Sequence, residues 1–160
     1  MFSITLICVG KLKEKFYLSA SEEYAKRLRG YVDFSLIELP ETRLPDDPSP
    51  AQIAQGLAKE AELIRAKLPK GAWFCVLTPE GAQLSSEELA AVLASVKGSG
   101  KSSACFLIGS SFGMDPSLKA MADKKLSMSK MTFPHHLARV MALEQFYRAE
   151  SIQAGTKYHK

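Results

Sequence analysis

The stretch LSMSKMTFPHHLARVMALEQFYRA, Leu126–Ala149, contains a short apolar burst, a polar loop and a long helical pattern. The burst at 126–129 is typical of a strand, and Thr132 followed by Pro134 predicts the cap and first turn of a helix that runs to about Gln153. Apolar residues cover more than one face of this helix. One apolar face packs on the chain's own core, so the second predicts a subunit contact, unless the helix is central in a larger core.

Toward the N-terminus, apolar bursts rich in branched residues alternate with helical patterns. The bursts predict strands at 4–9, 34–39, 73–77 and 104–108. The patterns between them predict helices at 16–28, 51–68 and 85–96, the last with a capping box formed by Ser85 and Glu88. Asp115 and Pro116 predict the start of a shorter helix after the fourth strand. This order predicts an α/β fold, a parallel sheet with helices on both faces, in a single domain over residues 1–160.

The composition fits a globular, cytoplasmic protein. Of 160 residues, 46% are hydrophobic and 24% charged, and no apolar run is long enough to cross a membrane. The N-terminus MFSITLICVG lacks the basic region of a signal peptide, so we expect a strand there. Cys8, Cys75 and Cys105 are odd in number and lie in apolar bursts, which favours reduced core thiols over disulfides or a metal cluster.

Positive charge is concentrated in four clusters, although the formal net charge is only +4. The clusters are Lys11, Lys13 and Lys15; Lys26, Arg27 and Arg29; Lys124 and Lys125; and Lys157, His159 and Lys160. Each cluster alone is typical of a solvated surface. Four of them in so small a chain favour RNA or DNA as a partner.

Loops that follow the third, fourth and fifth strands predict a ligand site, because ligands of parallel α/β sheets bind at the carboxyl ends of the strands. These loops are LTPEG (77–81), IGSSFG (108–113) and MSKMTFPH (128–135). Gly109 and Gly113 would let the backbone approach a ligand, although a tight turn alone also explains them. The patterns GxxxxGK[ST] and GxGxxG are absent, which disfavours nucleoside triphosphates and the usual dinucleotides.

The final helix carries most of the side chains capable of chemistry. His135 and His136 are adjacent, roughly 100° apart around a helix, so we expect no metal site of the i, i+4 kind, and either could be an ordinary helix-start residue. Glu144 and Arg148 have the spacing of an intrahelical ion pair. The chain has no GxSxG elbow, which disfavours hydrolase chemistry.

Several segments resemble the ribosomal RNA large subunit methyltransferase H family of the SPOUT class: ITLICVGKLKEKFY, EEYAKRL, FLIGSSFG, LSMSKMTFPHHLARVMALEQFYRA and the closing YHK. The resemblance covers the whole chain in order. It implies an α/β fold with a deep C-terminal trefoil knot, a homodimer and S-adenosylmethionine as cofactor. It also implies methylation of N3 of a pseudouridine in helix 69 of 23S large-subunit rRNA, in assembled 70S ribosomes.

The resemblance also assigns roles by position. It implies that the cofactor is bound by Leu77, Gly109, Met128, Ser129, Lys130, Met131, Thr132 and Phe133. It implies that the active-site candidates are His135, Arg148, Tyr158 and His159, with no metal. Two positions depart from the family pattern, which has Gly-Gly at Gly109-Ser110 and Gly-Lys at Gly81-Ala82. A left-handed backbone at Ser110 would cost about 1–2 kcal/mol.

The same resemblance suggests a role for the terminal GTKYHK. We expect this tail to lie across the neighbouring subunit's pocket, with Tyr158 against a flipped base and with Arg148 and His159 stabilising the anionic base. So small a chain has few residues that could recognise an RNA sequence. We therefore expect specificity to come from the shape of the assembled ribosome. The alternatives are a non-catalytic RNA- or ribosome-binding α/β dimer and a flavodoxin-like nucleotide-handling protein.

Overall fold

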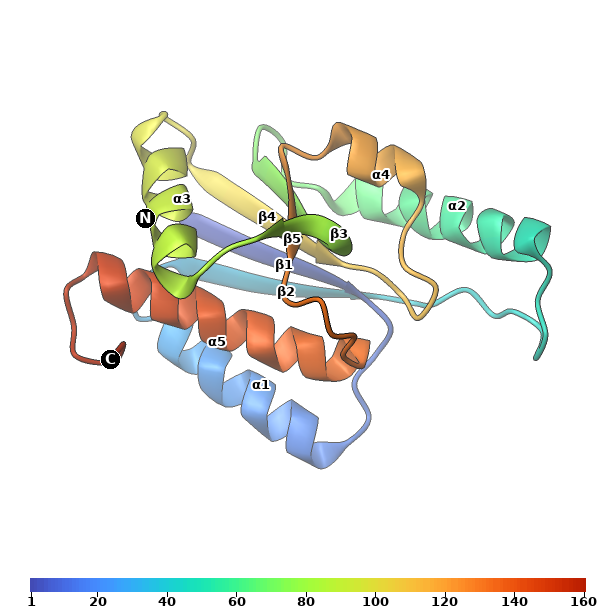
Figure 1. Ribbon diagram of the computed structural model, residues 1–160, viewed down its shortest axis with the longest axis horizontal. Helices are drawn as coiled ribbons and strands as arrows, with labels where there is room; N and C mark the ends of the chain where they lie inside the picture. Colours follow the sequence, from blue (N-terminus) through green and yellow to red (C-terminus); the bar gives the residue numbers. More distant parts are fainter.

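The computed structural model describes all 160 residues and contains one five-stranded, fully parallel sheet with the order β2-β1-β4-β3-β5 (Figure 1). The strands are β1 (Ser3–Val9), β2 (Asp33–Leu39), β3 (Trp73–Gln83), β4 (Ser103–Ile108) and β5 (Lys124–Ser127). β1 lies between β2 and β4, with Leu6 opposite Leu36 on one side and Phe106 on the other. The predicted α/β class with a parallel sheet is confirmed.

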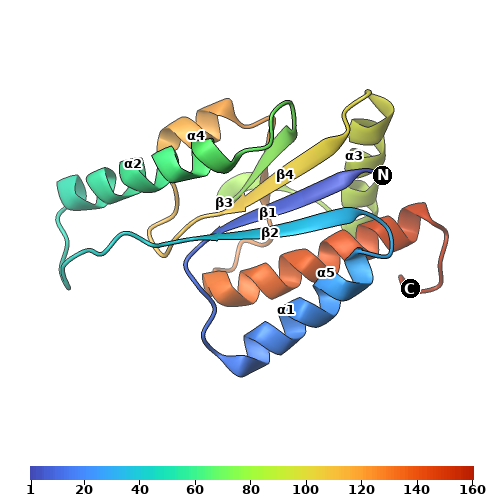
Figure 2. The ribbon, with the colours of Figure 1, turned by 180° about the vertical axis from the view of Figure 1, so that it is seen from behind.

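Helices cover both faces of the sheet (Figures 1 and 2). They are α1 (Lys15–Leu28), α2 (Pro50–Lys67), α3 (Ser86–Gly98), α4 (Pro116–Met121) and α5 (His135–Gln153). α5 packs against both α1 and α3 on one face, whereas α2 and α4 lie on the other. None of these helices is both long and apolar enough to span a bilayer.

Side chains that alternate along the central strands build a separate core on each face. On the α5 face, the ring centroids of Phe106 and Phe146 lie 4.3 Å apart, with Leu6 in the same cluster. On the α2 face, Leu107 packs in one cluster with Ile64. β1 and β4 are buried almost throughout, which explains their continuous apolar runs.

The three cysteines belong to these cores. Cys8, Cys75 and Cys105 are all buried and free, as predicted. Burial raises the pKa of each thiol to about 12, so each stays protonated at neutral pH. An unreactive packing role follows, because the thiolate is the nucleophilic form.

Three predicted boundaries are wrong near the C-terminal loops. β5 begins at Lys124 and ends at Ser127, so the burst at 126–129 is half loop. β3 runs on to Gln83, because it pairs with β5 again after a register shift that follows Leu77. Thr132 does not cap α5, whose N-cap is Pro134 and has no side-chain hydrogen bond. The other predicted starts are confirmed: Ser85 and Glu88 form a capping box, and Asp115 caps α4.

The extension of β3 passes in backbone contact with β5. A Cβ atom on Gly81 would lie 2.7 Å from the backbone N and C of Leu126, closer than real Cβ atoms come. Only glycine allows this approach. α4 lies on the α2 face of the sheet and α5 lies on the opposite face. Between these two helices the chain forms β5, which makes the contact with Gly81.

A buried arginine fixes α5 to the sheet. Arg139 is only 1% exposed, and it donates to the Glu38 carboxylate at 2.5 Å and to the carbonyl oxygen of Gly10 at 2.9 Å. Leu12 N also donates to Glu38 at 3.2 Å. Burial raises the pKa of Glu38, but these hydrogen bonds and the charge of Arg139 outweigh burial and hold the pKa below its ordinary value. The start of α5 is thereby tied to the ends of β1 and β2.

We expect Glu38→Gln to lower the free energy of unfolding by about 2 kcal/mol at pH 7, because it leaves the Arg139 charge buried without its counter-ion. The contribution of Glu38 is present above the ordinary carboxyl pKa and is lost as the pH falls through the lowered pKa of the folded state. Urea unfolding at pH 7 and pH 3 should therefore separate wild type and variant more at pH 7. Glu23→Gln, which breaks an exposed pair with Arg27, is the matched control and should change little. Equal stability of Glu38→Gln and wild type at pH 7 would contradict this role.

Candidate active site

A cavity of about 770 Å³ opens at the carboxyl ends of β3, β4 and β5. Its walls come from Leu77–Pro79, from Ile108–Met114 and from the loop after β5, with His135 and Ala138 of α5 closing one side. These are the three loops that the sequence singles out. Pockets of this volume hold ligands of the size of common cofactors.

Seven of the eight predicted cofactor residues line this cavity. They are Leu77, Gly109, Met128, Ser129, Met131, Thr132 and Phe133. Lys130 is the exception, because it is exposed and outside the cavity lining. Ser129 shapes the loop, since its hydroxyl accepts from Met131 N at 3.0 Å and its carbonyl oxygen accepts from Ser127 Oγ at 3.0 Å.

The turn after β4 needs glycine at two positions. Ser110 and Gly113 exchange backbone hydrogen bonds of 2.9 Å, and Gly113 has a φ of +89°. A Cβ atom on Gly109 would lie 2.7 Å from the Gly113 carbonyl carbon. Ser110 is not left-handed, because no residue other than glycine has a positive φ. The departure from Gly-Gly therefore causes no backbone strain here.

The cavity contains little free positive charge. Lys119 is its only lysine or arginine, and its Nζ lies 2.5 Å from Glu80 Oε1. Hydrogen bonds from Lys119 and then from Thr78 lower the pKa of Glu80 to about 2, so the carboxylate stays charged. A neutralised lysine in a largely apolar cavity is poorly suited to a phosphate group.

The two histidines at the start of α5 lie together. The rings of His135 and His136 stack with centroids 4.2 Å apart, beside Gly10, where a Cβ atom would approach His135 Cε1 to 3.3 Å. Burial, followed by the charges of His135 and Arg139, lowers the pKa of His136. Only His135 of the pair lines the cavity. The structure contains no group of three or more potential metal ligands.

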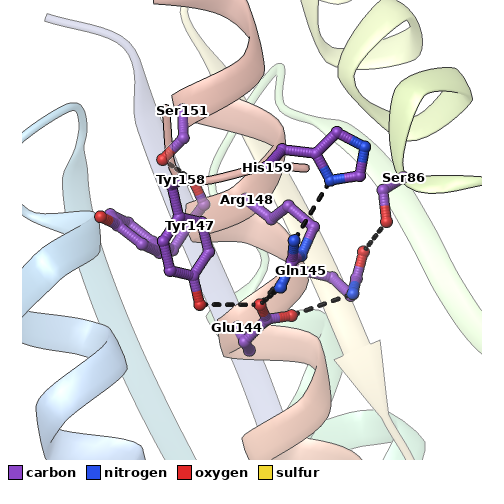
Figure 3. Close-up of polar contacts among 8 residues, drawn as sticks. All are labelled: Ser86, Glu144, Gln145, Tyr147, Arg148, Ser151, Tyr158 and His159. Carbon is purple, nitrogen blue, oxygen red and sulfur yellow. Dashed lines mark hydrogen bonds and ion pairs between the residues drawn. The ribbon is translucent and has the colours of Figure 1, made fainter. Parts of the chain in front are cut away.

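The other three active-site candidates, Arg148, Tyr158 and His159, form a second cluster, the tail cluster. In it the C-terminal tail folds against its own chain (Figure 3). Arg148 donates to Glu144 through Nε at 2.9 Å and through Nη2, and Tyr158 donates to the same carboxylate at 3.0 Å. His159 lies 3.1 Å from Arg148 Nη1 and 2.7 Å from Glu87. The predicted pair of Glu144 and Arg148 is confirmed.

Tyr158 is held as a hydrogen-bond donor in this cluster. Burial, and then the hydrogen bond to Glu144, raises its pKa to about 12. The guanidinium of Arg148 lies 4.8 Å from the centre of its ring. A phenol held in this state does not accept a proton at neutral pH, so its ring and its donated hydrogen bond are what it offers.

One chain does not bring the four active-site candidates together. His135 and Arg148 are thirteen positions apart on α5, which at 1.5 Å per residue separates them by about 20 Å. Arg148, Tyr158 and His159 therefore lie far from the cavity of their own chain.

One basic cluster lies near the cavity, and another lies near the C-terminal tail. α1 runs beside α5, with the ring of Tyr17 6.2 Å from His136 and Arg27 5.9 Å from the ring of Tyr147 (Figure 1). The cluster at 11–15 therefore lies near the cavity end of α5, and the cluster at 26–29 lies near the tail. The pair Lys124 and Lys125 is at the opposite, amino end of β5.

Sequence reasoning missed Glu87, Lys119 and Phe112. Glu87 is in the first turn of α3, where an acidic residue is normally explained by the helix dipole. Only the folded chain brings it to His159, 72 residues later. Phe112 is 48% exposed at the cavity, and a glycine-rich loop gave no reason to expect an aromatic wall there.

Comparison with known proteins identifies a family. A model of the family "Predicted SPOUT methyltransferase" matches residues 2–159. A protein of Moorella thermoacetica named ribosomal RNA large subunit methyltransferase H is 42% identical over the full length of both chains. One of the same name from Acetivibrio thermocellus is 45% identical, with 98% of this chain and 99% of that chain covered.

Solved structures share the fold at low sequence identity. A probable methyltransferase from Bordetella pertussis Tohama I matches with a TM-score of 0.55 and 12% identity, covering 92% of this chain and 93% of that one. The tRNA (m1G37) methyltransferase of Aquifex aeolicus matches with a TM-score of 0.54 and 13% identity, covering 98% and 73%. With the family match and the full-length relatives, the chain belongs to the ribosomal RNA large subunit methyltransferase H family of SPOUT methyltransferases.

Proposed function

We propose that this protein is an S-adenosylmethionine-dependent rRNA methyltransferase that acts as a homodimer on large-subunit rRNA. The finer proposal is methylation of N3 of a pseudouridine in helix 69 of 23S rRNA, in assembled 70S ribosomes of the cytoplasm. The observation that carries it is the cavity at the ends of β3, β4 and β5, in a chain whose full-length relatives are named rRNA large subunit methyltransferases. The deep trefoil knot is also part of the proposal, and it is supported by the change of face between α4 and α5 beside Gly81.

The cavity suits the proposed cofactor. Its volume and its apolar walls, among them Leu77, Ile108 and Phe133, fit an adenosyl group. Lys119 is neutralised by Glu80, so a sulfonium cation would meet no unpaired lysine or arginine. The same charge pattern disfavours the phosphate of a flavin nucleotide. S-adenosylmethionine supplies a methyl group on positively charged sulfur, and Gly109 would let the turn after β4 approach its adenosyl part.

The split of the active-site candidates supports a homodimer. His135 lines the cavity, but Arg148, Tyr158 and His159 lie about 20 Å along α5, and methyl transfer needs reacting atoms about 3 Å apart. The half-buried face of α5 that contains Leu137, Val140 and Met141 is the surface on which a second copy would pack. An antiparallel pair of α5 helices would place the tail cluster of one chain against the cavity of its partner.

The tail cluster fits the charge that develops during transfer. The N3–H group of a pseudouridine is a weak acid, and the base becomes anionic as its proton leaves. Arg148 is a permanent cation, and it would stabilise that anion in a site with little water. Tyr158, held by Glu144, offers its ring face to a flipped base. Positioning and electrostatic stabilisation are then the main contributions of the protein.

RNA contact is proposed for the basic clusters at 11–15 and 26–29. They lie at the two ends of α1, beside the cavity end and the tail end of α5. In an antiparallel dimer, the basic cluster at 11–15 of one chain would lie near the basic cluster at 26–29 of its partner, around each site that the two chains share. Lysine and arginine there would contact phosphates in a salt-dependent way, without reading sequence.

We expect Gly109→Ala to weaken S-adenosylmethionine binding about tenfold or more, because the new Cβ collides with the Gly113 backbone and deforms the cavity wall. Isothermal titration calorimetry measures the affinity, and circular dichroism checks the fold. Gly98→Ala is the matched control, since a Cβ there meets nothing within 4 Å. Wild-type protein that binds no S-adenosylmethionine would support a purely RNA-binding module.

We expect a mixed dimer to be more active than either parent when S-adenosylmethionine is too dilute to fill the weakened cavity of Gly109→Ala. Deletion of Tyr158–Lys160 should abolish methyl transfer with little change in cofactor affinity, because the proposed contact of the tail is with the base and not with the cofactor. Co-expression of this deletion with Gly109→Ala should restore part of the transfer, since one site of the heterodimer combines an intact cavity with an intact tail. Failure of restoration in a verified heterodimer would contradict a shared site.

We expect methyl transfer to assembled 70S ribosomes and little transfer to naked 23S rRNA, because so few protein residues are available for sequence readout. Mass spectrometry of the helix 69 fragment measures the product and locates the methyl group. With limiting S-adenosylmethionine, the Gly109→Ala variant should transfer less to the same particles and serves as the control. Equal transfer to naked rRNA would contradict recognition of particle shape.

A further inference from the structure

We propose that Glu144 is a positioning residue for methyl transfer, which holds Tyr158, Arg148 and His159 in one arrangement, in which His159 is the tautomer protonated on Nε2. This inference rests on the proposed function and assigns a role to a residue outside the four active-site candidates. In this arrangement His159 orients Arg148 and does not accept the proton of the substrate.

The carboxylate of Glu144 is the acceptor on which the tail cluster converges (Figure 3). Its Oε1 accepts from Tyr158 at 3.0 Å and from two nitrogens of Arg148, while Oε2 accepts from Gln145 Nε2 at 2.9 Å. The side chain is only 15% exposed, so these charge-assisted hydrogen bonds are shielded from water. A single carboxylate thus joins α5 to the C-terminal tail.

The network extends to the first turn of α3. Gln145 accepts from Ser86 Oγ at 2.6 Å, and the neighbouring Glu87 lies 2.7 Å from His159 Nε2. The tail is therefore held at Tyr158 by α5 and at His159 by α3. These two attachments restrict both tail residues that the proposed function places near the base.

The tautomer of His159 follows from its two neighbours. Arginine has only donors, so Arg148 Nη1 must donate to Nδ1 of His159, 3.1 Å away, and Nδ1 must be unprotonated. An ionised carboxylate has only acceptors, and hydrogen bonding to His159 holds the pKa of Glu87 below its ordinary value. Nε2 must then carry the proton and donate it to Glu87. Neither ring nitrogen has a free lone pair for the substrate.

The same assignment leaves Arg148 ready to act. Three of its five N–H groups are directed to Glu144 and His159. The other two, one on Nη1 and one on Nη2, have no protein partner and are held in a fixed plane. A planar pair of donors suits an oxygen of the anionic base. Loss of Glu144 would release the guanidinium from this orientation, although its charge would remain.

The test compares Glu144→Gln with Glu23→Gln, which makes the same change in the i, i+4 pair with Arg27 on α1. In the full-length dimer, we expect Glu144→Gln to lower kcat for ribosome methylation about 10- to 100-fold. Its affinity for S-adenosylmethionine should stay within about twofold of wild type, since Glu144 contacts Gln145, Arg148 and Tyr158 and none of these lines the cavity. Glu23→Gln should match wild type in both. A variant whose cofactor affinity and thermal stability fall in parallel with kcat would indicate a structural role and overturn the proposal.

A second readout reports the tautomer directly. Long-range ¹H–¹⁵N spectra of the wild-type dimer should show His159 protonated on Nε2 alone, with the signal assigned by its loss in His159→Gln. Glu144→Gln should shift the Nδ1 signal of His159, because Arg148 is released from its orientation and no longer donates to Nδ1, while Glu87 still holds the proton on Nε2. A His159 protonated on Nδ1 in wild type, or a signal unchanged in Glu144→Gln, would overturn the proposal.

Different results would overturn the proposed function and the role of Glu144. Wild-type protein that binds S-adenosylmethionine but methylates no rRNA would overturn the proposed function and the role of Glu144 with it. Active wild-type protein with an unchanged kcat for Glu144→Gln would overturn only the role of Glu144. The nuclear magnetic resonance spectra need no substrate, so the tautomer is decided in either case.

Discussion

The buried guanidinium of Arg139 determines where α5 lies, and the candidate site depends on the position of α5. Arg139 donates to Glu38 at the end of β2 and to the Gly10 carbonyl after β1, and its Nε has no partner. A buried charge with few partners tolerates little movement, because each lost hydrogen bond leaves a desolvated group. His135, one turn away, is therefore held at the cavity wall. The rest of the helix is rigid, so the position of Arg148 follows from the same anchor.

The two ends of α5 have opposite electrostatic character. At its start, the cavity is largely apolar and its one lysine is neutralised by Glu80. At its end, charged side chains from α3, α5 and the tail are linked through Glu144 and His159. A cationic methyl donor suits the first environment and an anionic base suits the second. Methyl transfer requires both environments at the same place, which one straight helix cannot provide. The division of charge along α5 is therefore the physical reason to propose that two chains share each site.

Periodicity and turn chemistry predicted most of the fold, because those signals are local. Apolar bursts marked the strands, and the Ser85–Glu88 box and Asp115 marked two helix starts. The errors lie where tertiary contact overrides local preference. β3 continues past Leu77 only because β5 pairs with it again, and the charged start of β5 gave no apolar signal. The cavity loops were predictable from the strand order, whereas the contact of Glu87 with His159 depends on packing between distant segments. Resemblance to a family supplied the active-site candidates, which local patterns had not separated from ordinary helix residues.

The pair of Glu144 and Arg148 can both stabilise α5 as an i, i+4 ion pair and position the C-terminal tail. An i, i+4 pair on an exposed helix adds only about 0.2–0.5 kcal/mol, so its spacing alone gives no reason to expect a function. The side chains of this pair are only 25% and 15% exposed, and its carboxylate also accepts from Tyr158. Partial burial strengthens this contact, because separating two charges that are shielded from water would leave each of them without a hydrogen-bond partner. The tail then has one low-energy arrangement on α5, and it is held there before any substrate arrives. Preorganisation of this kind reduces the entropy that must be lost during binding and leaves the two free N–H groups of Arg148 aimed in a constant direction.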